Sequence, residues 1–541
     1  MRFFLRVGLA LVLALGAAPV WADDDYAAGT QFLIQKQYAS AIAAFRRAAA
    51  QGDERASLAL GKMYVFGNGV ETDRRAGAAW LLRAAEKRSA EAQYLLGAMY
   101  FDGVGVPADD AKALFWIWEA SENGSLDAQH ALGGMYMSGR GVDRNEREAL
   151  NWYNRAATGG QIEAQVALGT MYLTGKVVTQ NDTFAYLWFK KAAEAGNVVA
   201  QRFMGILYAS GRGTRKDDAM AFSWYRKAAT QGDAVAQRNL GIFYATGRGV
   251  KTDFKEAGVW YRKAALQGDD RAQYGLGALY SRGAGVPKDD AQAVLWYRQA
   301  SRRLADAQYA LGLMYSQGRG VERNAPQAAY WYQMAAVQGY ARAQFNLGLM
   351  LDAGQGIAQD AEAASEWLIR AAENNVKEAQ SYVAYRYAQG IGVQQDNRRA
   401  AAWYEKAAQA GDARSQYNLG VMYLWGRGVR ADDKKAAEWF LKAARQGDFR
   451  AQHSLGALYE EGRGVRKNYD TASMWYARAA ATEYARSRQV LYGEERPVPA
   501  GLMDMEDAMA EPEPRVLQPR MFRPAQPESL PQSGALPAAV R

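Results

Sequence analysis

Residues 415–448 read SQYNLGVMYLWGRGVRADDKKAAEWFLKAARQGD, and variants of this stretch recur along most of the chain. Aligning the residue four positions before each Leu-Gly, or its equivalent, gives twelve units that are 36 residues apart, except for one step of 35 between Ala272 and Ala307. A fixed period of this length predicts a repeat array in which each unit packs on its neighbours. The units begin at Ala56, Ala92, Ala128, Ala164, Ala200, Ala236, Ala272, Ala307, Ala343, Ala379, Ser415 and Ala451.

Each unit contains two helical stretches. In the first, as in residues 415–425, the recurring residues fall at offsets 0, 4, 5, 7 and 8, which is the period of an amphipathic helix. The second, as in residues 433–446, combines small residues with a tryptophan in the same period. No part of the array alternates with a period of two for long, so the sequence predicts no sheet.

A glycine turn joins the two stretches. The pattern G-x-G-V, as in residues 426–429, predicts the end of the first helix, because glycine readily takes a positive φ. Three residues after the valine stands Asp or Asn, the preferred helix N-cap, and seven residues later stands a tryptophan. The twelve predicted caps are Asp73, Asp109, Asn145, Asn181, Asp217, Asp253, Asp289, Asn324, Asp360, Asp396, Asp432 and Asn468.

A second glycine follows the leucine inside the first helix, with Ala384 as the one exception among the twelve units. Glycine costs about 1 kcal/mol against alanine at such a position. Its recurrence therefore predicts a close approach of the two helices in each unit.

The combined pattern resembles the Sel1-like repeat, a relative of the tetratricopeptide repeat, over residues 56–486. Val177, in place of the second turn glycine, and Arg386, in place of an apolar residue, are local departures. The resemblance implies an all-α fold, a right-handed superhelical solenoid of about twelve 36-residue helix-turn-helix repeats with a concave groove. It also implies an adaptor role in protein–protein interaction.

The start of the chain, MRFFLRVGLALVLALGAAPVWA, is typical of a secretory signal peptide, because two arginines precede an apolar run that ends in small residues. The run is too short to span a membrane. We therefore expect export to the periplasm of a Gram-negative bacterium, with secretion or surface association as the alternative. The expected organisation is a signal peptide (1–22), a divergent helix pair (23–55), the repeats (56–486), the end of a capping helix (487–492) and a Pro-rich disordered tail (493–541).

That tail holds nine of the thirteen prolines and a net charge of −3. Its composition predicts disorder, with a short helix around residues 502–509. We interpret it as a linker, with a docking peptide around residues 521–522 as the alternative.

Composition and charge limit the kinds of partner and site that we expect. The formal charge is +9, which falls to +7 without Arg2 and Arg6, and this favours anionic partners. The chain has no cysteine, which excludes disulfides, thiolate metal sites and a lipoprotein anchor. We expect no nucleic acid partner for an exported protein, and no integral membrane span.

Four Asp-Asp pairs and the G-x-G turns invite catalytic interpretations. The pairs begin at Asp109, Asp217, Asp289 and Asp432, all at the cap position of a repeat, whereas a catalytic dyad should be unique. The turns lack the preceding strand and the further residues of a nucleotide-binding loop. The two histidines, His130 and His453, lie nine units apart and cannot share a metal. We therefore expect no enzyme, no metal and no cofactor.

The side of the first helix opposite its recurring residues is the expected binding site. Offsets 2, 3, 6, 9 and 10 project there, and in related arrays this variable side lines the groove. Tyrosine and arginine are common interface anchors, and asparagine can hold a peptide backbone. The candidates are Arg202, Arg238, Asn239, Tyr274, Arg282, Tyr309, Asn346, Asn418 and Trp425. Phe66, Phe101 and Trp425 are apolar residues expected to be exposed there.

Two classes of function follow. The first is a non-catalytic scaffold that binds segments of partner proteins in the cell envelope, with a secreted factor that binds a host protein as its variant. The second is a binder, or an assembly or export factor, of an anionic cell-wall or exported polysaccharide. The repeat fixes the framework and leaves the groove free to vary, so the sequence does not name the partner.

Overall fold

The computed structural model describes residues 25–492, and the side chains of residues 25–483. The predicted signal peptide and the Pro-rich tail, with its predicted helix and docking peptide, lie outside the described residues. The described part contains helices α1 to α26 and no strand. Helices α1 (Asp25–Ile34) and α2 (Tyr38–Ala50) precede the first repeat.

Each of the twelve repeats contributes a first and a second helix. The first helices are α3 (Glu54–Phe66), α5 (Ala90–Asp102), α7 (Leu126–Ser138), α9 (Ile162–Thr174), α11 (Val198–Ser210), α13 (Ala234–Thr246), α15 (Asp270–Arg282), α17 (Ala305–Gln317), α19 (Ala341–Ala353), α21 (Lys377–Gln389), α23 (Ala413–Trp425) and α25 (Phe449–Glu461). The second helices are α4 (Arg74–Glu86), α6 (Asp110–Glu122), α8 (Glu146–Thr158), α10 (Asp182–Glu194), α12 (Asp218–Thr230), α14 (Phe254–Leu266), α16 (Asp290–Ala300), α18 (Ala325–Val337), α20 (Ala361–Glu373), α22 (Asn397–Gln409), α24 (Asp433–Arg445) and α26 (Tyr469–Tyr492).

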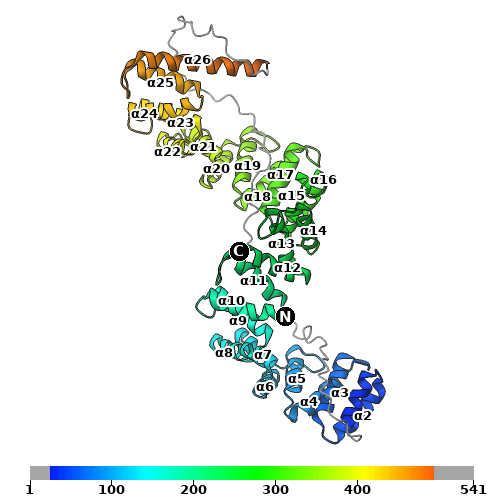
Figure 1. Cartoon of the computed structure of the whole chain (residues 1–541). Helices are drawn as coiled ribbons and strands as arrows, with labels where there is room; N and C mark the ends of the chain where they lie inside the picture. Colours follow the sequence, from blue (N-terminus) through cyan, green and yellow to red (C-terminus); the bar gives the residue numbers. More distant parts are fainter. Residues whose placement is uncertain (1–24, 493–541) are drawn as a thin grey trace. The chain divides into compact units, whose positions relative to one another are not determined.

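The array divides into two compact units between Thr252 and Asp253. Within each unit, every helix packs on the helix before it and the helix after it in the chain (Figure 1). This neighbour-on-neighbour packing is the arrangement of an α-solenoid, in which a repeat buries its core against the next repeat.

Local sequence explains where the helices begin and end. All twelve predicted N-caps are confirmed, because each Asp or Asn side chain accepts a hydrogen bond from a backbone N–H in the first turn of its helix. Asp432, for example, accepts from the Lys435 N–H at 3.0 Å. The first turn glycine ends the first helix in a left-handed conformation, as at Gly426 with φ of 65°.

The second turn glycine permits close contact between repeats. A Cβ atom on Gly428 would lie 2.0 Å from the carbonyl oxygen of Asn397, at the start of the preceding repeat's second helix. The glycine inside the first helix has a different neighbour, since a Cβ on Gly420 would lie 2.6 Å from the Phe440 ring of the same repeat. Both glycines therefore mark close approaches, one between repeats and one within a repeat.

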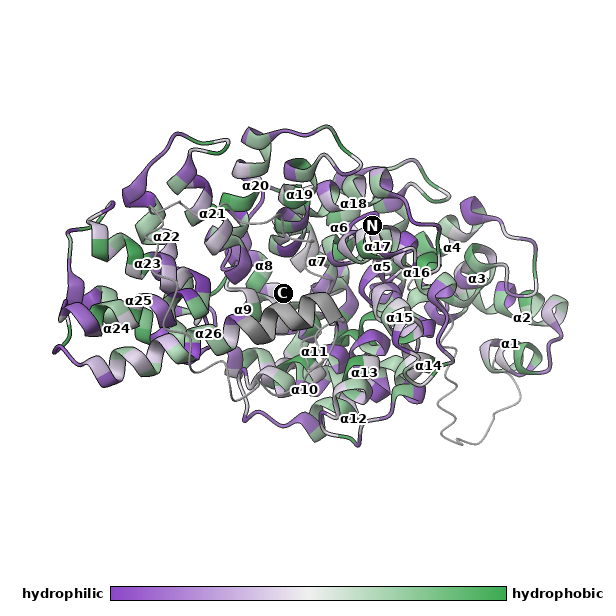
Figure 2. Ribbon diagram, turned by 90° about the horizontal axis from the view of Figure 1, so that it is seen from above, coloured by the Kyte–Doolittle hydropathy of each residue, from purple (hydrophilic) through white to green (hydrophobic). Residues whose placement is uncertain are grey.

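The core alternates small and large side chains. In the tenth repeat and the start of the eleventh, Ala400, Tyr404 and Leu419 are all buried. Helices carry both hydrophobic and hydrophilic residues, whereas many of the turns that join them are hydrophilic (Figure 2).

A buried glutamine in the first helix connects successive repeats. The Gln416 amide donates to the Ala408 carbonyl oxygen at 3.0 Å, at the end of the preceding repeat, and its own oxygen accepts from Gln446 at 2.8 Å. The same donor contact occurs at Gln93, Gln129, Gln165, Gln201, Gln237, Gln273, Gln308, Gln344 and Gln452. Most of these helix-end carbonyls also accept an N–H from the following turn, so the glutamine adds a second bond that ties the end of one repeat to the next.

Candidate binding face

The paired aspartates have separate structural partners. Asp432 caps α24, whereas Asp433 accepts hydrogen bonds from Arg463 in the turn of the next repeat. The same division holds at the other three pairs, whose second aspartates bind Arg140, Arg248 and Arg319. The carboxylates of each pair are therefore used in capping and in ties between repeats.

Asp182 repeats this ion pair without a neighbouring aspartate. Arg212 donates to it at 2.7 Å and 2.9 Å, and these hydrogen bonds hold the pKa of the Asp182 carboxyl below its ordinary value. The lowered pKa reflects a structural pairing between repeats.

The two histidines pack on tyrosines of their own repeats. The ring centroids are 5.5 Å apart for His130 and Tyr153, and 5.1 Å apart for His453 and Tyr476. Within the described residues, no three His, Asp or Glu side chains group in a way that could hold a metal ion. No described helix has the length and apolar character to cross a membrane.

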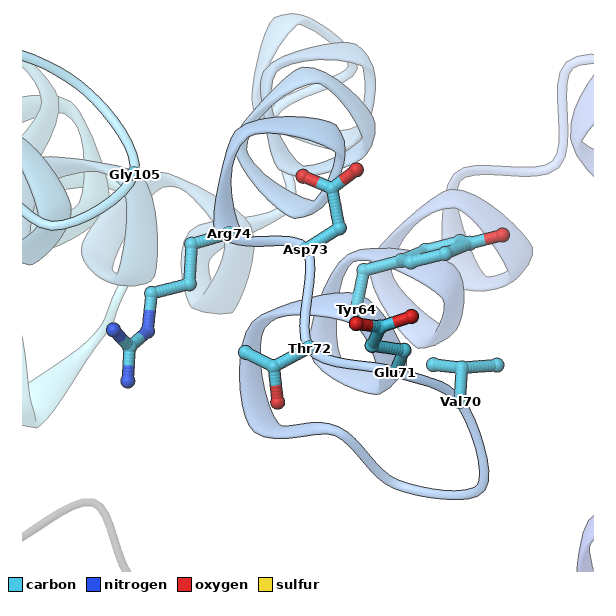
Figure 3. A pocket seen from close by; sticks show the side chains of 7 residues that line it. All are labelled: Tyr64, Val70, Glu71, Thr72, Asp73, Arg74 and Gly105. Atoms are coloured by element: carbon cyan, nitrogen blue, oxygen red, sulfur yellow. The ribbon is translucent and has the colours of Figure 1, made fainter.

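A hollow of about 720 Å³ lies at the turn of the first repeat. Arg74 points away from Tyr64 and Glu71, so the polar groups do not converge on a common point (Figure 3). Asp73 is already used as the cap of α4, where it accepts from the Ala76 N–H at 2.9 Å. The hollow is lined by Tyr64, Val70, Glu71, Thr72, Asp73, Arg74 and Gly105.

The three candidate asparagines face the preceding repeat. Asn239 is only 3% exposed, which corrects the expectation that it projects into the groove. Its side chain interacts with Tyr225 of α12, and Asn418 interacts in the same way with Tyr404 of α22. A helical wheel of one helix misplaced Asn239, because the wheel omits the neighbouring repeat that covers this position.

Two candidate arginines are also held by the framework. Arg202 is half-buried and donates to Asp233, the cap of α13, at 2.8 Å. Arg238 is half-buried beside Tyr225, whose pKa is raised by burial and lowered in part by the arginine charges around it. Both side chains contribute to packing between repeats in the first unit.

Tyrosines from consecutive repeats of the second unit come together. Tyr309 of α17 stacks on Tyr340, the residue before α19, with ring centroids 4.8 Å apart and planes 28° apart. Tyr274 of α15 lies close enough for its charge to influence Tyr340 and to be influenced by Tyr309. We call Tyr274, Tyr309 and Tyr340 the tyrosine cluster; each ring is half-buried.

Polar groups border the tyrosine cluster. Asp306 of α17 influences both Tyr274 and Tyr340, and burial raises the pKa of its own carboxyl. Asn346 of α19 is a hydrogen-bond partner of the Tyr309 hydroxyl, and of Tyr332 in the second helix of the eighth repeat. The cluster therefore presents flat aromatic surface, hydroxyl groups and one half-buried carboxylate.

The remaining candidates differ in exposure. Arg282, at the end of α15, is exposed and influences Tyr274, and Trp425, at the end of α23, is 54% exposed. Phe66 and Phe101, expected to be exposed, are half-buried against hydrophobic clusters instead. The guanidinium of Arg140 from the next repeat lies 3.7 Å from the centroid of the Phe101 ring and covers it.

Sequence reasoning missed Tyr340 and Asp306. Tyr340 carried a signal, because it stands at the N-cap of a first helix, where other repeats have a capping aspartate such as Asp233 or Asp412. Loss of an N-cap side chain costs about 1 kcal/mol. An aromatic residue at this position therefore indicates a role other than capping.

Comparison with known proteins identifies the fold. The Sel1 repeat family matches residues 55–89, 90–125, 126–161, 162–197, 198–233, 234–269, 270–303, 305–340, 341–376, 377–412, 413–448 and 449–481. The solved structure of c5321, a protective antigen of uropathogenic Escherichia coli strains with an SLR fold, is 33% identical with a TM-score of 0.68, over 85% of this chain and 99% of that one.

A Sel1 repeat protein from Oxalobacter formigenes is 36% identical over 57% of this chain and 90% of its own, with a TM-score of 0.46. No curated protein is significantly similar to this chain. Sel1 repeat proteins are generally non-catalytic scaffolds for protein interaction. Twelve matched repeats and the solenoid of paired helices place this chain in the Sel1 repeat family.

Proposed function

We propose that this protein is a non-catalytic scaffold of the bacterial cell envelope that binds a segment of a partner protein along the first helices of its second unit. The observation that supports this function is the tyrosine cluster, in which half-buried rings from consecutive repeats lie together, two of them at positions that the sequence predicts for the groove. Tyrosines give large contact areas at low conformational cost, and they are enriched where one protein anchors another.

The cluster favours a particular kind of segment. Tyr274 and Tyr309 offer ring faces that suit an aromatic or proline side chain. Asp306 is a half-buried carboxylate, and a lysine or arginine of the partner would offset the cost of keeping its charge away from water. The proposed ligand is therefore a protein segment that carries a basic residue beside an aromatic residue or a proline.

The location in the envelope rests on the signal peptide predicted for residues 1–22. Cell fractionation tests it, with the periplasmic fraction as the expected site and the culture medium as the alternative. Retention of the full chain in the cytoplasm would contradict export.

Photo-crosslinking in intact cells tests the binding face. A photoreactive residue at Arg282, beside the cluster, should capture a partner protein, whereas one at the exposed Glu405 of α22 should not. Tyr309→Ala combined with Tyr340→Ala should abolish capture from position 282 in a protein that keeps its helical content. Undiminished capture by this folded variant would contradict the proposed face.

Trp425→Ala gives a second measure, because the ring is exposed and its loss should leave the fold intact. Reduced capture would extend the face to the eleventh repeat. Salt-sensitive binding of an acidic polysaccharide, without any captured protein, would favour the polysaccharide class instead. Substrate turnover by the purified chain would overturn the non-catalytic assignment.

A further inference from the structure

Three consecutive second helices of the second unit, α14, α16 and α18, carry exposed apolar side chains. We call Val259 and Leu266 of α14, Leu295 of α16, and Tyr330, Met334 and Val337 of α18 the apolar stripe. All six are exposed, from 40% for Met334 to 73% for Leu266. They occupy the sixth, tenth or thirteenth position after the cap, which are three and four residues apart and share one face of a helix.

The tryptophans of α16 and α18 lack the cation that covers the tryptophan ring in most other repeats. In nine repeats a Lys or Arg three residues after the tryptophan covers its ring, as Lys263 covers Trp260 at 4.1 Å. That position is Gln299 in α16 and Met334 in α18, so two consecutive repeats lack the cation; the third repeat without it has Glu119 on α6. Helix α18 contains no charged residue along its whole length.

The two outer helices of this face, α14 and α20, carry opposite net charge. On α14 the exposed Lys255, Arg262 and Lys263 outweigh Glu256, which leaves a net charge of +2. On α20 the charged and exposed residues are Glu362, Glu366, Arg370 and Glu373, which leave a net charge of −2. The face formed by α14, α16, α18 and α20 is therefore mostly apolar in the middle, where the exposed Arg298 and Arg302 lie at the end of α16 and just after it, and is oppositely charged at its two ends.

This pattern is self-complementary. A two-fold axis between α16 and α18, parallel to both helices, would place α14 of one molecule opposite α20 of the other, and α16 opposite α18. The positive end then meets the negative end twice, and the apolar stripe meets itself, as an isologous interface requires. We propose that this face binds a second copy of the chain.

The face formed by these four helices is large enough for a stable dimer interface. A helix of 13 residues is about 20 Å long and about 10 Å across with its side chains, so four of them present about 800 Å². A stable interface of standard size buries about 800 Å² on each partner. The dimer would present two tyrosine clusters, and its formation does not require that they bind a partner.

Analytical ultracentrifugation of the mature full-length chain tests the proposal, with a dimer as the expected species at micromolar concentration. Val337→Glu combined with Met334→Glu should give a monomer with unchanged helical content and Tm. Lys87→Glu, an exposed change in the first unit, is the control and should leave the dimer intact. A monomeric full-length chain, or a dimer that tolerates the double variant, would overturn the proposal.

Charge reversal tests the orientation. Lys255→Glu with Lys263→Glu makes both ends of the face negative, and Glu362→Lys with Glu373→Lys makes both ends positive. Each double variant should weaken its own dimer about tenfold or more, and a mixture of the two should form a heterodimer of nearly native affinity. Without recovery in the mixture, the proposed two-fold arrangement is wrong.

The tail, residues 493–541, is the alternative occupant of the stripe within this chain, and its removal tests which of the two binds there. If the tail covers the stripe, the full-length chain is a monomer and the truncated chain dimerises. That result would assign the face to the tail and reject the second copy. Dimers of equal stability with and without the tail support the proposal.

Discussion

The guanidinium of Arg463 donates to both carboxylate oxygens of Asp433, at 3.0 Å and 3.1 Å, and so ties the turn of one repeat to the second helix of the repeat before it. Arg140, Arg212, Arg248 and Arg319 pair in the same way with the aspartate that begins the second helix of the preceding repeat.

Six turns have another residue at the position of this arginine. In each of them the preceding second helix, or α2 for the first repeat, begins with a residue other than aspartate. The residues at the arginine position are Asn68, Val104, Lys176, Ala284, Gln355 and Ile391. Aspartate at the start of a second helix is therefore always followed by arginine in the next turn.

Arg427 is the one turn arginine whose partner position holds no acid, because α22 begins with Asn397. Asn397→Asp should create the missing ion pair and stabilise the protein by about 0.2–1 kcal/mol, since the pair is exposed to solvent. The urea midpoint at low ionic strength measures the gain, which should shrink in 1 M NaCl, roughly the concentration at which salt screens exposed pairs.

Asn397→Ala is the matched control and should give no gain. Asp433→Asn should cause a loss of similar size, because it removes the partner of Arg463. An equal gain from Asn397→Asp at low and high salt would show that the ion pair is not its cause.

Alanine substitutions of Gly428 and Gly411 distinguish two costs: the strain of a positive φ, which both share, and a steric clash between repeats, which only Gly428 would have. Both have positive φ, 71° and 96°, but a Cβ on Gly428 would meet the Asn397 carbonyl at 2.0 Å, whereas a Cβ on Gly411 has no neighbour within 4 Å. Gly428→Ala should therefore cost about 1–3 kcal/mol more than Gly411→Ala. Urea unfolding of both variants measures the difference, and equal losses would contradict the close approach.

Gln416→Leu should destabilise the array. The change removes one of the two donors to the Ala408 carbonyl oxygen, which keeps the Gly411 N–H, and it leaves Gln446 without its acceptor, at a cost of about 0.5–1.5 kcal/mol. Thermal unfolding measures the loss. Gln446→Ala removes only the more exposed partner and should cost less; the reverse order would show that the carbonyl bond contributes little.

Asp306→Asn should stabilise the protein at neutral pH. Burial raises the pKa of the Asp306 carboxyl, so the folded state binds its proton more tightly than the unfolded state does. Stability therefore falls as pH rises from the ordinary value of 3.8 through the raised pKa, and the neutral amide avoids this loss.

Urea midpoints measured from acidic to neutral pH check this sign. The advantage of Asp306→Asn should be present at neutral pH and should vanish at the acidic end. Asp143→Asn, at an exposed turn position, is the control for the same substitution away from the cluster. A pH-independent advantage would mean that ionisation of Asp306 is not the cause.

The sequence by itself determined the repeat, its two helices and its twelve caps. These features depend on contacts within a few residues, as when Asp432 accepts from the Lys435 N–H. Such contacts form in the same way in every repeat, so twelve copies of one pattern were sufficient to predict them.

Only the tertiary structure decided what the variable positions do. Asn239 is buried, Asp433 binds an arginine 30 residues away, and Tyr340, at the N-cap of α19, stacks on Tyr309 of α17. Each outcome depends on how one repeat packs against the next, which the periodicity of a single helix does not describe. The exposed stripe on α14, α16 and α18 has the same origin, because stacking aligns residues that lie far apart in the sequence.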